Sequence, residues 1–264
     1  GNIEARYADN TWIGGFSGEI SGYSVVTNSY STGSIISGQA ANSIGGFTGG
    51  IRGINPEIYL SWSSGDITLN SYDAFGVGGF AGWVGVGGYT NDYIIVEDSY
   101  SLGDISVGAI GYETEWSAMI GGFAGYIKGM ITTNPMEISN CFSMGSISAI
   151  GEVIEVGGFV GGITGNGTNG TGSVVIDNTA SLGNFVEGYY ELGGYAGTID
   201  VATAQSLVIK NSYTRSNIVS KFIEIGNLDQ AFIAGFVPYV DTTGTSSTNI
   251  FNNYNDIILL KSGR

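Results

Sequence analysis

Hydrophobic and small residues alternate with variable residues in a short segment that recurs along the chain. In its first copy, Phe16, Gly18 and Ile20 share one parity, whereas Glu19 lies between them and is replaced freely in later copies. Residue types that recur at every second position, with variable residues between them, are typical of a β-strand with one buried face. The segment therefore predicts a strand whose conserved side packs into a core.

This segment occurs seven times, with successive aromatic residues 31 to 43 residues apart. The copies share an aliphatic residue, a glycine pair, an aromatic residue and a later glycine, and the last copy is degenerate. They begin at Ile13, Ile44, Val77, Ile120, Val156, Leu192 and Ile233. Units of this length cannot bury a core alone, so the repetition predicts stacked units that share one core.

A second motif follows each copy, 12 to 19 residues after its aromatic residue. Its clearest versions are Asn28–Ile35, Asp98–Ile105 and Asn140–Ile147. We expect a strand in which Ile138, Asn140 and Phe142 share a face, followed by a turn into a third short strand. No segment carries a helical apolar stripe, so the pattern predicts two or three short strands per coil and no helix.

The repeats predict an all-β fold, a right-handed parallel β-helix (β-solenoid) of about seven imperfect repeats. The alternative repeat fold is a β-propeller, whose blades need four strands each and are usually longer. We expect residues 1–264 to form a single β-solenoid repeat domain. Because Gly1-Asn2-Ile3 matches the tail of the second motif, we expect the domain to be a fragment of, or continuous with, a larger repeat array.

The two motifs together resemble the GLUG-motif repeat family of bacterial surface proteins and adhesins. That family pairs a Gly-Gly-Leu-x-Gly element with an Asn-[Cys/Ser]-[Tyr/Phe]-x-x-Gly-x-[Val/Ile] element, and in this chain Phe or Tyr replaces the leucine. The family's repeats occur outside the catalytic domains of large surface proteins. The resemblance therefore implies a secreted or cell-surface accessory region, and it carries over no catalytic residues.

Composition narrows the possible classes further. The chain has 46 glycines but only 3 prolines, which excludes collagen, and 42% hydrophobic residues, which is enough to order a chain. A net charge of -15 opposes binding to nucleic acid and to anionic membranes. No apolar run reaches the ~20 residues that a membrane-spanning helix needs, so we expect no membrane insertion.

Candidate chemistry is sparse. The chain has no histidine, which removes the usual general base and the commonest zinc ligand. Glu113 and Glu115 lie beside Trp116 and suit glycoside cleavage in principle, but a solvated acidic loop is the simpler interpretation. Cys141 has no partner for a disulfide and is expected to be a small buried residue. We therefore expect no enzymatic activity and no cofactor.

Metal binding has little support in the sequence. Neither the Gly-Gly-x-Gly-x-Asp nonapeptide nor an EF-hand loop occurs. Asp66 and Asp104 each follow the glycine of the second motif, but most repeats have serine or asparagine there. We predict no metal site.

Two polar rows accompany the second motif. The first is expected to be a structural ladder of amides that bond from coil to coil. Its members are Asn28, Asp98, Asn140, Asn178, Asn211 and Asn252. The second is a row of serines and threonines, for example Ser99 and Ser101, which either point inward at a crowded corner or form a flat outer surface suited to ordering water, as in ice binding.

Trp83 and Tyr126 occupy equivalent variable positions in consecutive repeats, so we expect them to be neighbours that point outward. An exposed aromatic pair is a candidate surface for binding a sugar or a protein. The alternative is that the two rings stack between coils and only cover backbone.

Two functions fit these observations. The first is a non-catalytic extracellular scaffold or adhesin segment that projects another domain or presents binding surfaces to glycans or proteins of host or neighbouring cells. The second is a self-assembling subunit of an extracellular filament or sheath, built by head-to-tail stacking of solenoids.

Overall fold

The protein is a parallel β-solenoid with no helix among the residues described in the computed structural model. Those residues are 1–5, 11–38, 41–70, 74–85, 92–110, 118–129, 134–151, 154–165, 173–188, 191–201, 206–220, 232–241, 247–251, 253–255 and 259–261. Strands at equivalent positions stack into five parallel sheets, which we name A to E. The predicted solenoid is thus confirmed.

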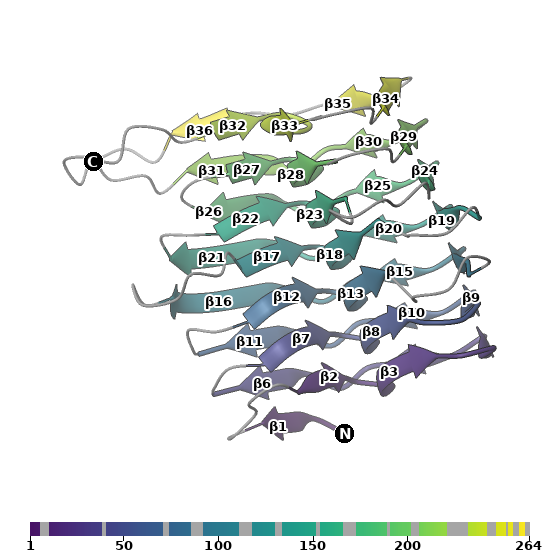
Figure 1. Cartoon of the computed structure of the whole chain (residues 1–264). Helices are drawn as coiled ribbons and strands as arrows, with labels where there is room; N and C mark the ends of the chain where they lie inside the picture. Colours follow the sequence, from purple (N-terminus) through teal and green to yellow (C-terminus); the bar gives the residue numbers. More distant parts are fainter. Residues whose placement is uncertain are drawn as a thin grey trace.

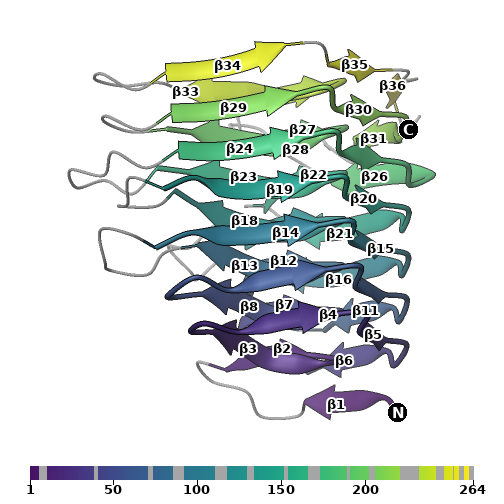
Figure 2. The same cartoon turned by 90° about the vertical axis from the view of Figure 1, so that its right-hand side faces the viewer.

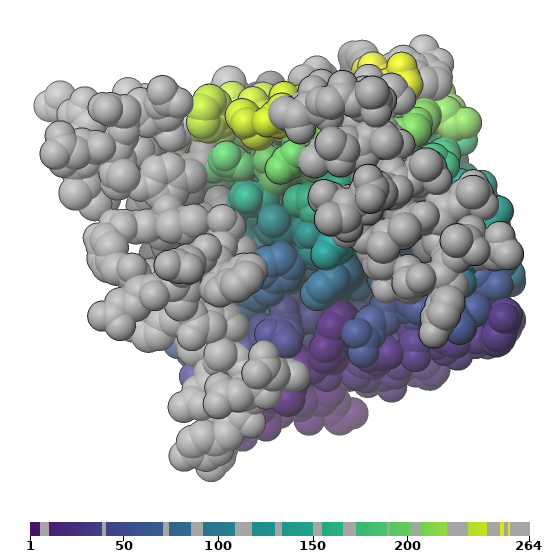
Figure 3. Space-filling view, in the orientation of Figure 1, coloured from purple at the N-terminus to yellow at the C-terminus, as the bar shows by residue number. Residues whose placement is uncertain are grey.

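Each complete coil passes through sheets B, C, D, E and A in that order, so coil 1 comprises β2–β6 and coil 7 comprises β32–β36. Sheets B and C form the front wall in Figure 1, and sheet D follows them on the side turned toward the viewer in Figure 2. The coils rise from β1 at one end to β36 at the other and wind in a right-handed sense (Figures 1 and 2). In the space-filling view they form successive coloured bands (Figure 3).

Sheets A and B enclose one half of the interior. Sheet A contains β1 (Ile3–Ala5), β6 (Ile35–Ser37), β11 (Ile67–Leu69), β16 (Ile105–Ile110), β21 (Ile147–Gly151), β26 (Phe185–Gly188), β31 (Asn217–Ser220) and β36 (Leu259–Lys261). Sheet B contains β2 (Trp12–Gly14), β7 (Ala41–Gly45), β12 (Ala74–Gly78), β17 (Ala118–Gly121), β22 (Ile154–Gly157), β27 (Glu191–Gly193) and β32 (Phe232–Ala234). Their inward aliphatic residues, such as Ile35, Ile67 and Val77, form one buried cluster.

Sheets C and D enclose the other half. Sheet C contains β3 (Ser17–Ser21), β8 (Thr48–Arg52), β13 (Ala81–Gly85), β18 (Ala124–Lys128), β23 (Val160–Thr164), β28 (Ala196–Asp200) and β33 (Tyr239–Asp241). Sheet D contains β4 (Val25–Thr27), β9 (Glu57–Tyr59), β14 (Ile94–Glu97), β19 (Met136–Ser139), β24 (Ser173–Asp177), β29 (Ser206–Lys210) and β34 (Ser247–Phe251). Val84, Ile127 and Ile138 belong to this second buried cluster.

Sheet E consists of two-residue strands that bridge sheets D and A. They are β5 (Tyr30–Ser31), β10 (Trp62–Ser63), β15 (Tyr100–Ser101), β20 (Phe142–Ser143), β25 (Ala180–Ser181), β30 (Tyr213–Thr214) and β35 (Tyr254–Asn255). The hydroxyl of Ser63 donates a 2.6 Å hydrogen bond to the carbonyl of Gly79 across the interior. Sheet E therefore touches the glycine corner of the front wall, and this contact divides the interior into its two halves.

The aromatic residue of the first motif forms an internal ladder. The Phe80 and Phe123 rings stack with their centroids 4.8 Å apart and an interplanar angle of 4°, and both side chains are fully buried. The same stacking continues from Phe16 through Phe47, Phe80, Phe123, Phe159 and Tyr195 to Phe236. This ladder explains why every copy of the motif keeps an aromatic residue at this position.

The prediction of two or three strands per coil is wrong, because each complete coil has five. Two corners account for the difference. The glycine pair of the first motif turns the chain between sheets B and C. The first residue of the second motif, Asn140 for example, takes a left-handed conformation with φ of 53° between sheets D and E. Each predicted strand region is therefore cut into two shorter strands.

Candidate binding surfaces

The outer sides of sheets B and C fold onto each other along a seam that runs the length of the stack. Glycine makes this close approach possible: a Cβ placed on Gly82 would lie 2.5 Å from the backbone nitrogen of Ile44, and one on Gly197 would lie 2.7 Å from that of Val156. Contacts this short exclude any side chain. The variable positions of the two strands consequently face each other across the seam and not open solvent.

Trp83 and Tyr126 lie in this seam. They are register partners on β13 and β18, and their ring centroids are 5.4 Å apart at 69°, which confirms that they are neighbours. The Trp83 ring also stacks on Trp12 at 5.3 Å, and Phe75 meets Tyr126 edge-on at 4.9 Å. Sheet B therefore supplies rings that cover both side chains.

The prediction that this pair points outward is wrong for Tyr126. Its side chain is only 5% exposed, and its hydroxyl group bonds to the hydroxyl of Thr164. Trp83 is partly exposed, but its Nε1 is buried without a hydrogen-bond partner among the described residues. The folded seam explains both observations, and it leaves no open aromatic surface at Tyr126.

Carboxylates occupy the seam in the next two coils. Glu155 and Glu191 are register partners on β22 and β27, and each has a buried Oε2 atom with no hydrogen-bond partner among the described residues. Burial raises the pKa of Glu155 to about 8, and the negative charges of Glu191 and Asp200 add to this rise. Burial likewise raises the pKa of Glu191, although a hydrogen bond with Thr198 opposes it.

The predicted asparagine ladder is only partly an amide ladder. The Asn178 amide donates a 2.8 Å hydrogen bond to the side-chain oxygen of Asn140, but Asn211 donates instead to Asp177 at 2.9 Å. The described members share exposed side chains and a left-handed backbone, with φ between 49° and 53°: Asn28, Asp98, Asn140, Asn178 and Asn211. Asn252 lies outside the described residues.

The backbone conformation explains this row better than side-chain bonding does. Asparagine and aspartate tolerate the left-handed region more readily than other non-glycine residues. The left-handed residue also reverses the alternation of side chains: Ile138 is buried, Asn140 is exposed and Phe142 faces outward with partial exposure. The prediction that these three residues share a face is therefore wrong.

The serine and threonine row points inward. Ser99 and Ser101 are fully buried, and the Ser101 hydroxyl donates a 2.5 Å hydrogen bond to the carbonyl of Gly122. Thr179 and Thr214 are buried in the same way. This arrangement confirms the inward alternative, and the described serines and threonines of the row form no ice-binding surface.

The outward side of sheet E carries an aromatic ladder that sequence reasoning missed. Tyr30 stacks on Trp62 at 4.9 Å, Trp62 on Tyr100 at 5.8 Å, and Tyr100 on Phe142 at 4.8 Å, all with interplanar angles below 10°. Tyr30 is 62% exposed and the other three are partly exposed. The aromatic residue of the second motif indicated this ladder. The prediction that Phe142 shares a face with the buried Ile138 placed this residue on the wrong side of the strand.

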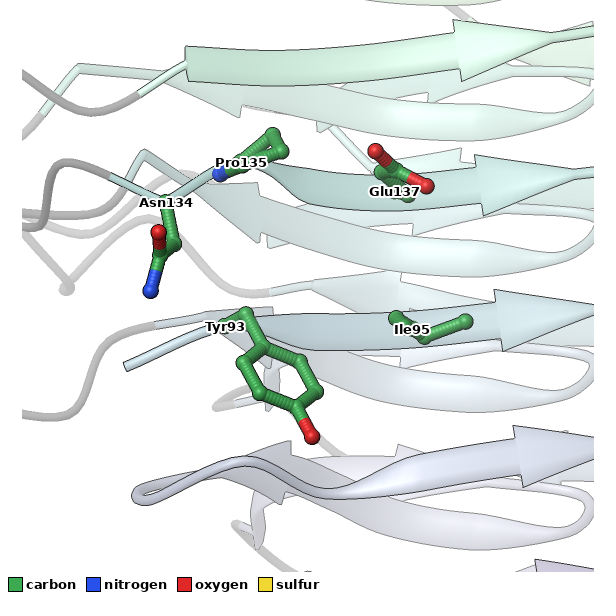
Figure 4. Close-up of a pocket in the computed structure, with 5 residues that line it drawn as sticks. All are labelled: Tyr93, Ile95, Asn134, Pro135 and Glu137. Carbon is green, nitrogen blue, oxygen red and sulfur yellow. The ribbon is translucent and has the colours of Figure 1, made fainter. Parts of the chain in front are cut away.

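A groove lies on the outward side of sheet D, in the two coils that also carry Tyr100 and Phe142 of this ladder. It has a volume of about 370 Å³ and is lined by Tyr93, Ile95, Asn134, Pro135 and Glu137. Figure 4 shows the Tyr93 ring extending from β14 away from β19, with the Glu137 carboxylate on β19. The groove is open and shallow, with apolar and acidic walls.

One carboxylate fixes two tyrosine rings next to this groove. The hydroxyl group of Tyr93 donates to Glu57 Oε1 at 2.6 Å, and that of Tyr59 donates to Glu57 Oε2 at 2.9 Å. Burial and this hydrogen bond raise the pKa of Tyr59 to about 12. We call the outward sides of sheets D and E in coils 1 to 4 the D–E face.

The remaining candidate residues have structural surroundings or lie outside the described part. Asp66 Oδ1 accepts a 2.9 Å hydrogen bond from the backbone of Asp104, and Asp104 Oδ1 accepts one of 2.7 Å from the backbone of Ser146. These carboxylates therefore bridge coils at a corner. Within the described ranges no three Cys, Asp or Glu side chains gather as ligands for a metal ion. Glu113, Glu115 and Trp116 are not among the described residues.

Cys141 is fully buried at the corner between sheets D and E, as expected. Burial raises the pKa of its thiol well above the usual range. The thiol lies 3.1 Å from the carbonyl oxygen of Ser139, to which it donates a hydrogen bond. A buried thiol of this kind is a poor nucleophile and a poor metal ligand.

No protein-family model, curated protein or solved structure matches the chain significantly. The resemblance to the GLUG-motif family stays a prediction. In the described part of the chain no helix is long and apolar enough to cross a membrane.

Proposed function

We propose that this chain is a non-catalytic scaffold or adhesin segment of an extracellular, bacterial-type surface protein. The observation that carries the proposal is the continuous stacking of five parallel sheets through seven coils. Such a stack has its first and last strands at opposite ends, about 34 Å apart at roughly 4.8 Å per coil. It therefore spaces whatever is attached at its two ends and presents its walls as regular surfaces.

The chemistry of the described residues supports a non-catalytic role. The buried carboxylates of the seam face other side chains, and the single cysteine is enclosed in the core. The D–E face is an open surface whose groove combines aromatic, aliphatic and acidic side chains. Open grooves of this kind suit contact with a larger partner better than enclosure of a small substrate.

The proposal is tested by coating inert beads with the purified chain and counting their attachment to bacterial and animal cells. Beads coated with an unrelated acidic protein serve as the control. Attachment above the control supports adhesion. Attachment equal to the control, with rigid monomeric particles in small-angle X-ray scattering, would leave only the spacer role. Particles that are flexible and extended would contradict the scaffold itself.

A second candidate is a self-assembling subunit of a filament or sheath. The pairing between coils favours it, because a strand of a second copy can continue each parallel sheet in the same way as a strand of the same chain. Analytical ultracentrifugation over a range of concentrations separates the two candidates, since only the second predicts a growing series of head-to-tail polymers.

A further inference from the structure

The D–E face alternates apolar and acidic side chains in two dimensions. On the groove floor, Ile95 has Glu57 as its register partner on β9 and Glu137 as its partner on β19. Neighbouring strands lie about 4.8 Å apart, so an aliphatic patch is flanked by carboxylates on both sides. Tyr93 closes one end of this patch, with its ring fixed by Glu57.

The carboxylates of this face have no cationic partner in the described part of the chain. The ion pairs formed there join Arg52 with Glu19 and Lys210 with Asp177, and neither involves the D–E face. Glu137 is exposed. The carboxylate groups offer hydrogen-bond acceptors only, so their complement is a group that carries donors and positive charge.

Sheet E extends the face with apolar edges. Because Tyr30, Trp62, Tyr100 and Phe142 stack on one another, the ring faces between neighbours are covered and the ring edges point outward. A sugar ring binds an aromatic residue through the flat face, which this ladder does not offer between its members. Exposed aliphatic residues lie beside the ladder: Leu102 is 38% exposed and Met144 is 49% exposed.

We propose that the D–E face binds a polypeptide segment in which lysine or arginine residues alternate with apolar ones. The methylene stem of a basic side chain fits over Ile95 and the Tyr93 ring, while its charged head reaches Glu57 or Glu137. The apolar residues of the partner pack against the ladder, Leu102 and Met144. This inference assigns a partner class to the adhesin role and rests on that proposed function.

The test uses a synthetic peptide of alternating lysine and leucine as the probe, with an alternating glutamate and leucine peptide as its control. Methyl NMR of the full chain reads out Ile95 on the D–E face and Ile36 on sheet A. We expect the basic peptide to shift the Ile95 methyl resonance and to leave Ile36 unchanged. The absence of a shift at Ile95 would overturn the proposal without any variant.

Two matched double variants separate the site from the overall charge. Glu57→Gln with Glu137→Gln removes two charges from the D–E face, and Glu4→Gln with Glu187→Gln removes two from the outer side of sheet A. We expect the first pair to weaken peptide affinity at least tenfold and the second by less than about twofold. Equal losses would show attraction to the net charge alone and would overturn the proposal.

A neutral chito-oligosaccharide is added in parallel. If it shifts Ile95 and the basic peptide does not, the face binds glycans and the assignment to a basic polypeptide is wrong. Cell attachment of beads coated with the Glu57→Gln, Glu137→Gln chain distinguishes failure of the partner assignment from failure of the adhesin function. Attachment retained in full contradicts this inference while the adhesin function stands, whereas no attachment by the unmodified chain contradicts that function directly.

Discussion

Glu155 and Glu191 occupy the same position on adjacent coils, and each keeps one carboxylate oxygen buried without a hydrogen-bond partner among the described residues. Two like charges about one strand spacing apart repel each other strongly in a poorly solvated seam. Asp200 on β28 adds to the negative potential at Glu155, and Tyr126 on β18 brings no positive charge. The seam is therefore most stable when these groups carry protons.

This arrangement predicts that stability falls as the pH rises. The pKa of Glu155 is about 8 in the folded chain against an ordinary value of 4.5. Between these values the unfolded chain has lost a proton that the folded chain retains, so the free energy of unfolding decreases by up to about 1.4 kcal/mol per pH unit. Below about pH 4.5 and above about pH 8 this contribution is constant. Urea denaturation across pH 4 to 9 measures the slope.

Glu155→Gln tests the source of this slope. The amide cannot ionise, so the variant should lose much of the decline and be more stable than the parent at pH 8. Glu137→Gln, which changes an exposed carboxylate of sheet D, serves as the control and should leave the slope unchanged. An undiminished slope in Glu155→Gln would assign the pH dependence to other groups.

Leu60 differs from the other left-handed residues between sheets D and E, which are asparagine or aspartate. Its replacement by asparagine is therefore expected to stabilise the fold. Leu60 has φ of 51° and is 51% exposed, at the position where other coils have asparagine or aspartate. Leu60→Asn should raise the free energy of unfolding by about 0.5–1 kcal/mol, because asparagine tolerates this conformation better. The reverse change, Asn178→Leu, should lower it by a similar amount. Denaturation midpoints of both variants give the comparison, and a destabilised Leu60→Asn chain would refute the strain argument.

The seam glycines predict a position-dependent response to alanine. Gly82→Ala places a methyl group 2.5 Å from the Ile44 nitrogen and should cost about 2–3 kcal/mol as the two sheets separate. Gly38→Ala is the matched control, since the nearest atom to its Cβ is the Ala5 carbonyl oxygen at 3.8 Å. The control should change stability by less than about 1 kcal/mol. Similar losses in both variants would argue against a tight seam.

The burial of Cys141 predicts that labelling of its thiol measures how often the stack opens. Because the thiol is fully buried and its pKa is raised, a soluble disulfide reagent should react with it only through unfolded or opened molecules. The logarithm of the labelling rate should therefore rise linearly with the urea concentration well below the midpoint. A chain with Cys141→Ser and Glu137→Cys carries an exposed thiol instead and should label rapidly at all urea concentrations. Rapid labelling of Cys141 in buffer would contradict its burial.

The fold was predictable because its strongest determinant is local and repeated. The aromatic residue and the aliphatic residue four positions later, Phe80 and Val84 in the third copy, recur in all seven copies, and seven copies leave few architectures open. The positions of the corners were not predictable from alternation alone. A left-handed residue such as Asn140 reverses which side of the chain faces the core, and this reversal depends on backbone conformation and not on hydrophobicity.

The candidate surfaces were harder to predict for a related reason. Trp83 and Tyr126 were correctly identified as neighbours, but their exposure depends on the folding of sheet B over sheet C, which involves residues far apart in the sequence. The outer ladder at Tyr100 and Phe142 was not predicted, because the left-handed residue at the preceding corner reverses the side on which these rings lie. The groove at Tyr93 requires two coils to be placed side by side, and no single motif contains it.

The stacking of strands also fixes how the molecule responds to force. Each described strand pairs only with the strand at the same position one coil away, so the hydrogen bonds between coils run along the axis of the stack. A pull applied between the two ends loads these bonds in series, and an end coil, which is held by only one neighbouring coil, detaches before an inner one. Each such step releases 31 to 43 residues, or roughly 100–150 Å of extended chain. The coil, and not the whole domain, is therefore the unit in which this protein lengthens under tension.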